Sequence, residues 1–322
     1  MAVWKKLLSL ALVLALTLCL GSALAEDKIS IGIVQYVTHN ALDAAREGFI
    51  AALKDNGYVD GENISLDIQN AQADQSNLST IADRFVANNV SLVLAIATPA
   101  AQAIAGKTTE IPILGTAVTD YVVARLANSN EVPGGNVSGT SDMNPVKDQI
   151  DLLQKLVPDA KTVGVIYTSS EDNSILQAKM AKEAIEAAGM TYVEVTVTNS
   201  NDVQQAVQDI VTRCDALYIP TDNVIASSMP IVYGATVESK TPVICGEASM
   251  VENGGLATLG INYYNLGYQT GLMAVKLLKG EAKISEMPIE TATGFDFAIN
   301  GQVADEIGLT IPDDLKQYVI AK

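Results

Sequence analysis

The feature that most constrains the fold is a series of alternating strand and helix patterns that occurs twice along the chain. The first copy begins at KISIGIVQY (28–36) and the second at KTVGVIYT (161–168), each a short run of β-branched residues with one glycine. In each copy a helical pattern follows and stops before Gly57 or Gly189, where glycine is the usual stop signal. The expected strands are 28–36, 64–71, 91–98 and 111–117, then 161–168, 191–197, 215–221 and 241–247, with helices at 41–56, 78–88, 177–188 and 202–213.

Strands that alternate with helices of these lengths form parallel sheets covered on both faces. A chain of 322 residues is too long for one ordinary core. We therefore expect an α/β protein with two doubly wound parallel-sheet lobes. PGGNVSGTSDMNP (133–145) predicts a turn or linker at the seam rather than core.

A further helix pattern at 262–280 and a strand-rich tail at 289–299 follow the second series. The helix has an apolar face that a lobe must cover. We assign residues 26–142 and 262–288 to the N-terminal lobe, and residues 143–261 and 289–322 to the C-terminal lobe. Several crossings between lobes suit a multi-strand hinge.

Residues 1–25 have the pattern of a secretory signal peptide. Lys5 and Lys6 precede an uncharged apolar run, and Ala23-Leu24-Ala25 offers small residues at the two positions that a signal peptidase reads. The run is shorter than the ~20 residues of a membrane helix. Cleavage before Cys19 by a lipoprotein peptidase is the less favoured alternative, since Leu18 is not small.

The charge balance excludes nucleic acid as a partner. The chain carries 20 basic and 37 acidic side chains, a net charge of -17, which repels a phosphate backbone. The two cysteines beyond the signal, Cys214 and Cys245, are too few for a disulfide framework. We expect an exported, acidic protein, periplasmic or at the cell surface, that acts as a monomer.

Ligands of open parallel sheets bind outside the carboxyl ends of the strands. Polar and small residues at those ends are therefore candidates for ligand binding. They are Gln35, Tyr36, His39, Thr98, Pro99, Ala100, Ala101, Ala117 and Thr119 in the first series, and Tyr167, Ser169, Ser170, Asn173, Ser174, Asp222, Asn223 and Glu247 in the second.

The stretch LVLAIATPAAQAIA (92–105) turns from strand to helix with almost nothing between. Thr98 suits the N-cap and Pro99 the first helical position. The small side chains of Ala100 and Ala101 leave the backbone N–H groups open, and the helix dipole favours an anion there. We expect this anion to be a ligand carboxylate rather than a phosphate, because no glycine-rich phosphate loop surrounds the start of the helix. Alternatively, Thr98 only caps its own helix.

Asp222 and Glu247 follow apolar strands of the second lobe and are expected to face the gap between lobes. Each suits a ligand ammonium or a helix N-cap, and the sequence leaves both readings open. Three tyrosines could supply the flat apolar walls of a ligand pocket, or only pack at the rim of the sheets: Tyr36, Tyr121 and Tyr167.

The sequence gives little support for catalysis. His39 is the single histidine, and no nucleophile elbow or matching signature accompanies it. No zinc or calcium ligand spacing occurs, so we expect no metal and no cofactor. We therefore expect a binding protein rather than an enzyme.

Nine stretches in order resemble one family. They are HNALDAAREGF, NAQADQSN, AIATPAAQA, AVTD, PGGNVSGTSD, SSEDNS, YIPTDN, GEASMV and ATLGINYYNLGYQTG. Together they resemble the tryptophan- and tyrosine-type solute-binding proteins of ABC transporters, over residues 28–300. The resemblance implies a type I periplasmic-binding fold that closes on an aromatic or other apolar amino acid and delivers it to a membrane permease.

The resemblance also implies roles for residues. Thr98, Ala100, Ala101 and Thr119 would hold the ligand carboxylate, and Asp222 or Glu247 the ammonium. Members commonly read AVTDP and then a glycine, where this chain has Tyr121 and Arg125, a departure in a loop at the cleft edge.

Three other functions are consistent with parts of this pattern. A ligand-sensing module of the same fold would signal to a chemoreceptor or kinase. A transcription regulator would need a helix-turn-helix where this chain has its signal peptide. A hydrolase would need His39 as its base.

Overall fold

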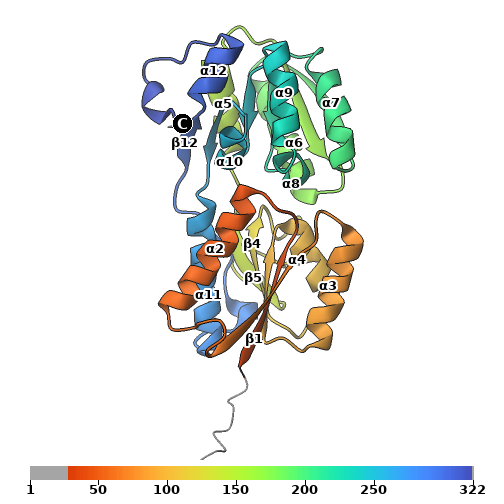
Figure 1. Ribbon diagram of the computed structural model, residues 1–322, viewed down its shortest axis with the longest axis vertical. Coiled ribbons are helices and arrows are strands. Elements are labelled where there is room, and N and C mark those ends of the chain that lie inside the picture. The colour runs from red at the N-terminus through yellow and green to blue at the C-terminus, as the bar shows by residue number, and fades with distance from the viewer. Residues whose placement is uncertain (1–27, 321–322) are drawn as a thin grey trace, which may run out of the picture.

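The computed structural model describes residues 28–320. The predicted signal peptide and the alternative site at Cys19 lie outside the described residues. Two lobes stand one above the other, each built on a six-stranded sheet with helices on both faces (Figure 1). The predicted fold class, two doubly wound and mostly parallel lobes, is confirmed.

The first sheet has the order β11-β5-β4-β3-β1-β2. Its strands are β1 (Ile29–Gln35), β2 (Ile64–Asn70), β3 (Leu92–Ile96), β4 (Ile113–Val118), β5 (Val137–Ser141) and β11 (Glu290–Thr291). Its helices are α2 (Asn40–Asp55), α3 (Gln75–Ala87), α4 (Thr98–Ala105) and α11 (Tyr263–Leu278), with the short 3-10 turn η2 (Ile284–Glu286).

The second sheet has the equivalent order, β12-β10-β9-β8-β6-β7. Its strands are β6 (Thr162–Thr168), β7 (Thr191–Val197), β8 (Ala216–Ile219), β9 (Val243–Cys245), β10 (Ala257–Gly260) and β12 (Asp296–Ile299), of which β12 runs antiparallel to β10. Its helices are α5 (Val146–Leu156), α6 (Asp172–Ala187), α7 (Val203–Ile210), α8 (Asn223–Ala226), α9 (Met229–Ser239), α10 (Ala248–Glu252) and α12 (Gly301–Ile307), with the 3-10 turns η1 (Ser200–Asp202) and η3 (Lys316–Tyr318).

All eight strands predicted from the repeated series form, but the predicted linker at 133–145 is wrong in part. Its centre is the fully buried strand β5, which pairs with β4. Gly139 has φ of 145°, and a Cβ there would lie 2.0 Å from the Gly115 carbonyl oxygen. The glycines that suggested a turn thus serve close packing inside a sheet.

Helix α11 packs against α2, although the two lie more than 200 residues apart in the sequence (Figure 1). Gly48 of α2 and Gly267 and Gly271 of α11 allow the two helices to lie this close. A Cβ on Gly48 would lie 2.0 Å from the Tyr264 carbonyl oxygen, and one on Gly267 would lie 1.9 Å from that of Ala45. The helix predicted at 262–280 therefore covers the first lobe.

The chain passes between the lobes at 142–145, 261–262 and 292–295. The last crossing differs from the predicted boundary at 288/289, because β11 still pairs with β5 of the first sheet. Within residues 28–320, no helix has the length and apolar character needed to span a bilayer.

Candidate functional site

A small cavity lies between the lobes, where the carboxyl ends of both sheets meet. Its volume is about 10 Å³, roughly the space for one water-sized group. It is lined by His39, Leu42, Ala117, Thr119, Asp142 and Tyr263 from the first lobe and its connections, and by Asn173, Thr221, Asp222, Asn223, Ala226, Glu247 and Met250 from the second. Of the predicted ligand-binding residues, the structure brings His39, Ala117, Thr119, Asn173, Asp222, Asn223 and Glu247 together here.

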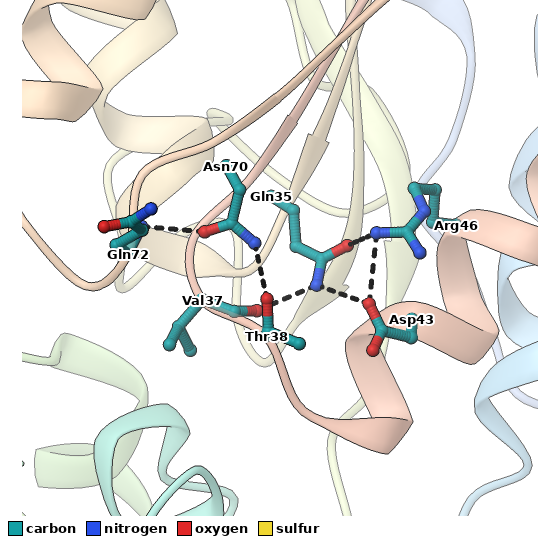
Figure 2. A network of polar contacts seen from close by, with 7 residues as sticks. All are labelled: Gln35, Val37, Thr38, Asp43, Arg46, Asn70 and Gln72. Atoms are coloured by element: carbon teal, nitrogen blue, oxygen red, sulfur yellow. Dashed lines mark hydrogen bonds and ion pairs between the residues drawn. The ribbon is translucent and has the colours of Figure 1, made fainter.

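Gln35 does not face the cavity, although it ends a strand. Its amide nitrogen donates to the Val37 carbonyl oxygen (2.8 Å) and to Oδ1 of Asp43 (2.9 Å). Its amide oxygen accepts from Arg46, which also pairs with Asp43 at 3.0 Å (Figure 2). Gln35 therefore fixes the loop that carries His39, and a direct contact of Gln35 with a ligand stays a prediction.

Tyr36 is buried against the gap between lobes. Burial raises its pKa, and the negative charges of Glu171 and Asp222 on the second lobe raise it further. Its hydroxyl lies 3.4 Å from the Ala73 carbonyl oxygen. Tyr36 is not among the residues that line the cavity, so its role as a wall for a ligand side chain stays a prediction.

The two other tyrosines considered as walls lie elsewhere. The Tyr167 hydroxyl donates to Glu194 of β7 at 3.3 Å, in an exposed position. Tyr121 is fully buried beneath β4 and β5 and donates to the Thr140 carbonyl oxygen at 3.1 Å. Neither tyrosine is among the residues that line the cavity.

The serines after β6 divide into two kinds. Ser169 and Ser170 are exposed, and the Ser169 hydroxyl donates to the Val197 carbonyl oxygen at 3.1 Å. Ser174 is fully buried, accepts from the Asn173 amide at 3.2 Å and supports the Asp222 carboxylate. Ser169 and Ser170 therefore lie at the rim of the site and Ser174 lies in the layer behind it, and ligand contacts of these serines stay predictions.

Helix α4 begins one residue earlier than expected. Ala97 is the N-cap, and Thr98 and Pro99 occupy the first two helical positions, with no side-chain cap hydrogen bond. The buried Thr98 hydroxyl has no partner, so the alternative that Thr98 only caps its own helix is wrong. The Ala101 N–H is already bonded to the Ala97 carbonyl oxygen at 3.1 Å, which leaves the N–H groups of Thr98 and Ala100 without an intrahelical acceptor.

Ala97 itself has φ of 85° and ψ of 153°, a region that is almost confined to glycine. Ala117, at the end of the neighbouring strand β4, also has a positive φ, 55°. Strained backbone of this kind clusters at functional sites. Gln72 and Ala73, in the turn after β2, also have positive φ values, 56° and 58°.

Asp222 and Glu247 are both buried N-caps. Asp222 accepts from the Ile225 N–H at 2.9 Å and from Thr168, and Glu247 accepts from Ser249 and from the Met250 N–H at 3.1 Å. Burial raises the pKa of Asp222, and raises that of Glu247 to about 7 against the opposing effect of its hydrogen bonds. Of the two readings that the sequence left open, the structure shows the cap for both residues.

Glu171 and Asp142 are buried acids that sequence reasoning did not single out. Glu171 precedes α6 without capping it, and its Oε1 atom has no partner. Burial raises its pKa first, and the charge of Asp222 raises it further. Asp142 accepts from the Thr119 hydroxyl (2.9 Å) and the Tyr263 hydroxyl (2.8 Å). Their position directly after a buried strand was the available signal, but SSED and TSD also read as solvated turns.

The His39 imidazole bridges towards the second lobe. Its Nε2 lies 3.3 Å from Oδ1 of Asn223, while its buried Nδ1 has no partner. Burial lowers the pKa of His39 to about 4, although the Asn223 contact and the charge of Asp43 oppose the shift. His39 is therefore neutral at physiological pH.

Other side chains also bond across the gap. The Gln102 amide of α4 donates to Asp172 of α6 at 2.8 Å, and the Gln177 amide lies 3.5 Å from the Thr119 hydroxyl. Together with the His39–Asn223 pair, they hold the lobes closed. An amino acid is larger than the cavity in this arrangement, so its entry requires the lobes to part.

The chemistry of the site is that of recognition by hydrogen bonds and charge. The cavity lining includes Asp142, Asp222 and Glu247 but no lysine or arginine. Across residues 28–320, no group of three or more histidine, cysteine, aspartate or glutamate side chains has the arrangement of a metal site. The cavity suits a group that donates hydrogen bonds to its acids, and none of the residues that line it belongs to α4, so ligand contacts of Thr98, Pro99, Ala100 and Ala101 stay predictions.

Comparisons with known proteins find a matching family and several similar proteins. The family model of ABC transporter substrate binding proteins matches residues 30–321. A tyrosine-binding protein of Clostridioides difficile (strain R20291) is 44% identical over 276 residues, 86% of this chain and 80% of that protein.

Two solved structures bear on the conformation. The ABC domain in complex with L-Trp from Streptococcus pneumonia is 38% identical and superposes with a TM-score of 0.88, covering 91% of this chain and 100% of that one. The ligand-free, open structure of a substrate binding protein with adhesive properties from Clostridium difficile is 46% identical, but its TM-score is 0.69, over 91% and 99% of the chains. The lobes of this chain are therefore arranged as in the L-Trp complex rather than as in the open structure.

Proposed function

The chain belongs to the family of ABC transporter substrate binding proteins, and on that premise we propose that it captures an aromatic amino acid and presents it to a membrane permease. The relatives that support the choice of ligand are the tyrosine-binding protein and the L-Trp complex. The observation that carries the proposal is the interlobe site itself. Its lining has buried acids on the second lobe and no basic side chain, and the start of α4 on the first lobe carries the buried, unpartnered Thr98 hydroxyl.

The ligand carboxylate belongs at the start of α4. The Thr98 hydroxyl is buried and unpartnered, and the N–H groups of Thr98 and Ala100 point out of the first turn of the helix. Thr119 lines the cavity nearby and keeps its hydroxyl on Asp142. Charge-assisted hydrogen bonds of this kind contribute about 1.5 to 3 kcal/mol each.

The ligand ammonium belongs on the second lobe. Asp222 and Glu247 are held in place by their own helices and give this side of the cavity its negative potential. A zwitterion then satisfies both lobes at once. Because it binds the closed state better than the open one, it drives closure without any bond-making step.

The predicted export and partners complete the proposal. The pattern at residues 1–25 supports secretion, with lipid attachment at Cys19 as the less favoured route. Two domains close on the ligand. The N-terminal lobe comprises residues 26–142 and the α11 region, and the C-terminal lobe comprises residues 143–261 and the C-terminal tail. We propose a monomer that docks on its permease in the closed state and uses no cofactor.

Calorimetry tests this function directly. Purified protein is titrated with L-tryptophan, L-tyrosine, L-phenylalanine and L-leucine, and with tryptamine and tyramine, which lack the carboxylate. We expect at least one aromatic amino acid to bind at micromolar concentration or below, and the amines to bind at least about tenfold more weakly. Equal binding of the amines would contradict the carboxylate site, and no binding of any amino acid would contradict the function.

A further inference from the structure

Three unpaired hydrogen-bond acceptors surround the second-lobe side of the cavity. They are Nδ1 of His39, Oδ1 of Asn173 and Oε1 of Glu171, each buried and without a partner. His39 and Asn173 line the cavity, and Glu171 is bonded to Asn173 and to Asn223, which lines it too. Unsatisfied buried polar atoms are rare and need an explanation.

The hydrogen-bond pattern fixes the His39 and Asn173 atoms as acceptors and leaves Oε1 of Glu171 free to accept once that carboxyl group is ionised. Glu171 Oε2 accepts from the side-chain amides of Asn173 (3.1 Å) and Asn223. The Asn173 nitrogen also faces the Thr221 carbonyl oxygen at 2.9 Å, so its Oδ1 is the free end of the amide. Because the Asn223 nitrogen donates to Glu171, its Oδ1 must accept from His39 Nε2–H, which leaves Nδ1 of the neutral imidazole as a lone pair.

We propose that these three atoms receive the three N–H groups of the ligand's primary ammonium, with Glu171 as its counter-ion. The inference rests on the proposed function and names the contact that Asp222 and Glu247 do not make, since the Glu247 oxygens accept from the first turn of α10 and the Asp222 oxygens accept from Ile225 and Thr168. The cavity volume of about 10 Å³ has room for one group the size of an ammonium. When Glu171 is ionised, a water molecule offers only two donors and leaves one of the three acceptors unpaired.

The ammonium links the lobes, because His39 comes from the first lobe and Glu171 and Asn173 come from the second. Opening the cleft separates the His39–Asn223 pair and divides the three acceptors between two walls. A ligand without the amino group therefore loses both its counter-ion and the contact that locks the closed state.

The site also exchanges a proton for the ligand. Burial and the neighbouring Asp222 raise the pKa of Glu171, so the ligand-free pair carries a proton near neutral pH. That proton sits on Oε1, because Oε2 accepts from two amides. Arrival of R–NH3⁺ converts the carboxylic acid to carboxylate and releases one H⁺ to solvent. Tyr36 also faces this pair, stays a neutral phenol because its pKa is raised, and takes no part in the exchange, and His39 with its low pKa stays neutral.

The first experiment compares the effect of one substitution on the binding of two ligands that differ only in the amino group. Wild type and Glu171→Gln are titrated with L-tryptophan and with 3-(indol-3-yl)propionate, which lacks only the amino group. Glu238→Gln, on the exposed face of α9, is the matched control. We expect Glu171→Gln to weaken tryptophan binding by about tenfold or more, and binding of the des-amino acid by less than about threefold.

A second measurement uses wild type alone and does not depend on the folding of a variant. Tryptophan is titrated near neutral pH in buffers of different ionisation enthalpy, and we expect about one proton to be released per ligand bound. Equal effects of Glu171→Gln on both ligands, or no proton release, would overturn the assignment of Glu171. If no aromatic amino acid binds wild type, the proposed function fails instead, so the two failures are distinguishable.

Discussion

The Nε2 atom of His39 in the first lobe lies 3.3 Å from Oδ1 of Asn223 in the second lobe. His39 lies on a loop that Gln35, Asp43 and Arg46 hold in place (Figure 2). Its contact with Asn223 connects this loop to the start of α8. The Asn223 amide also donates to Glu171. One side chain thus couples lobe closure to the state of the buried acid.

The first prediction concerns Asn223→Ala. The change removes the cross-lobe bond and one of the bonds to Glu171, so we expect ligand affinity to fall by about tenfold and closure to become less favourable. Calorimetry measures the affinity, and small-angle scattering with and without ligand measures closure. Asn201→Ala, at an exposed position of the second lobe, should leave both unchanged. Equal affinity of Asn223→Ala and wild type would show that the bridge has no part in binding.

The second prediction concerns backbone strain at Ala97. Its φ of 85° costs about 1 to 3 kcal/mol for a residue with a Cβ, whereas Ala95 lies in the regular strand β3. Ala97→Gly and Ala95→Gly each remove one buried methyl group and add the same chain entropy. We therefore expect Ala97→Gly to be the more stable variant by about 1 to 3 kcal/mol in urea unfolding. Equal stabilities would mean that Ala97 is not strained.

The fold was predictable to a large extent, because hydrophobic runs of strand length alternate with helical patterns twice. The prediction that was wrong is the linker near residue 139, where glycine was interpreted as a turn residue. A glycine that allows two strands to approach reads in the sequence like one that ends a strand, and only the contact with Gly115 distinguishes them.

The sequence predicted which strand ends form the site, but not which side-chain atoms are free to bind a ligand. The rule for parallel sheets selected His39, Asn173 and Asn223, all of which line the cavity. It could not separate Gln35, whose amide is used inside its own lobe, from residues that line the cavity. Nor could it single out Glu171 among its neighbours, because which carboxyl oxygen remains unpaired depends on side chains from residues 173 and 223.

The third prediction concerns the contact between α2 and α11. A Cβ at Gly267 would lie 1.9 Å from the Ala45 carbonyl oxygen, so Gly267→Ala forces the two helices apart. We expect a loss of about 3 kcal/mol or more in the free energy of unfolding, beyond the usual range for overpacking, because the clash is with backbone. Gly234→Ala in α9 is the control, since a Cβ there meets nothing within 4 Å and should stabilise the helix by about 0.5 to 1 kcal/mol. A stable Gly267→Ala protein would contradict the close crossing.

The last prediction concerns pH. Burial raises the pKa of Glu247 to about 7 and also raises that of Glu171, so the folded protein holds protons that the unfolded chain has released. Where the folded state binds more protons, stability falls as pH rises. We expect the free energy of unfolding of the ligand-free protein to fall by about 1 to 3 kcal/mol between about pH 6.5 and 9.

His39 does not disturb this window. Its pKa is about 4 in the folded protein and lower than in the unfolded chain, so its effect lies at acidic pH, where it lowers stability as pH falls. Urea unfolding at constant ionic strength measures the slope, and Glu247→Gln should remove part of it because a glutamine does not titrate. Saturation with tryptophan should remove a further part, because the ammonium keeps Glu171 ionised in the folded state. A slope that is flat or rises with pH would show that these carboxyl groups are charged in the ligand-free protein, and the exchange of proton for ammonium would then have no basis.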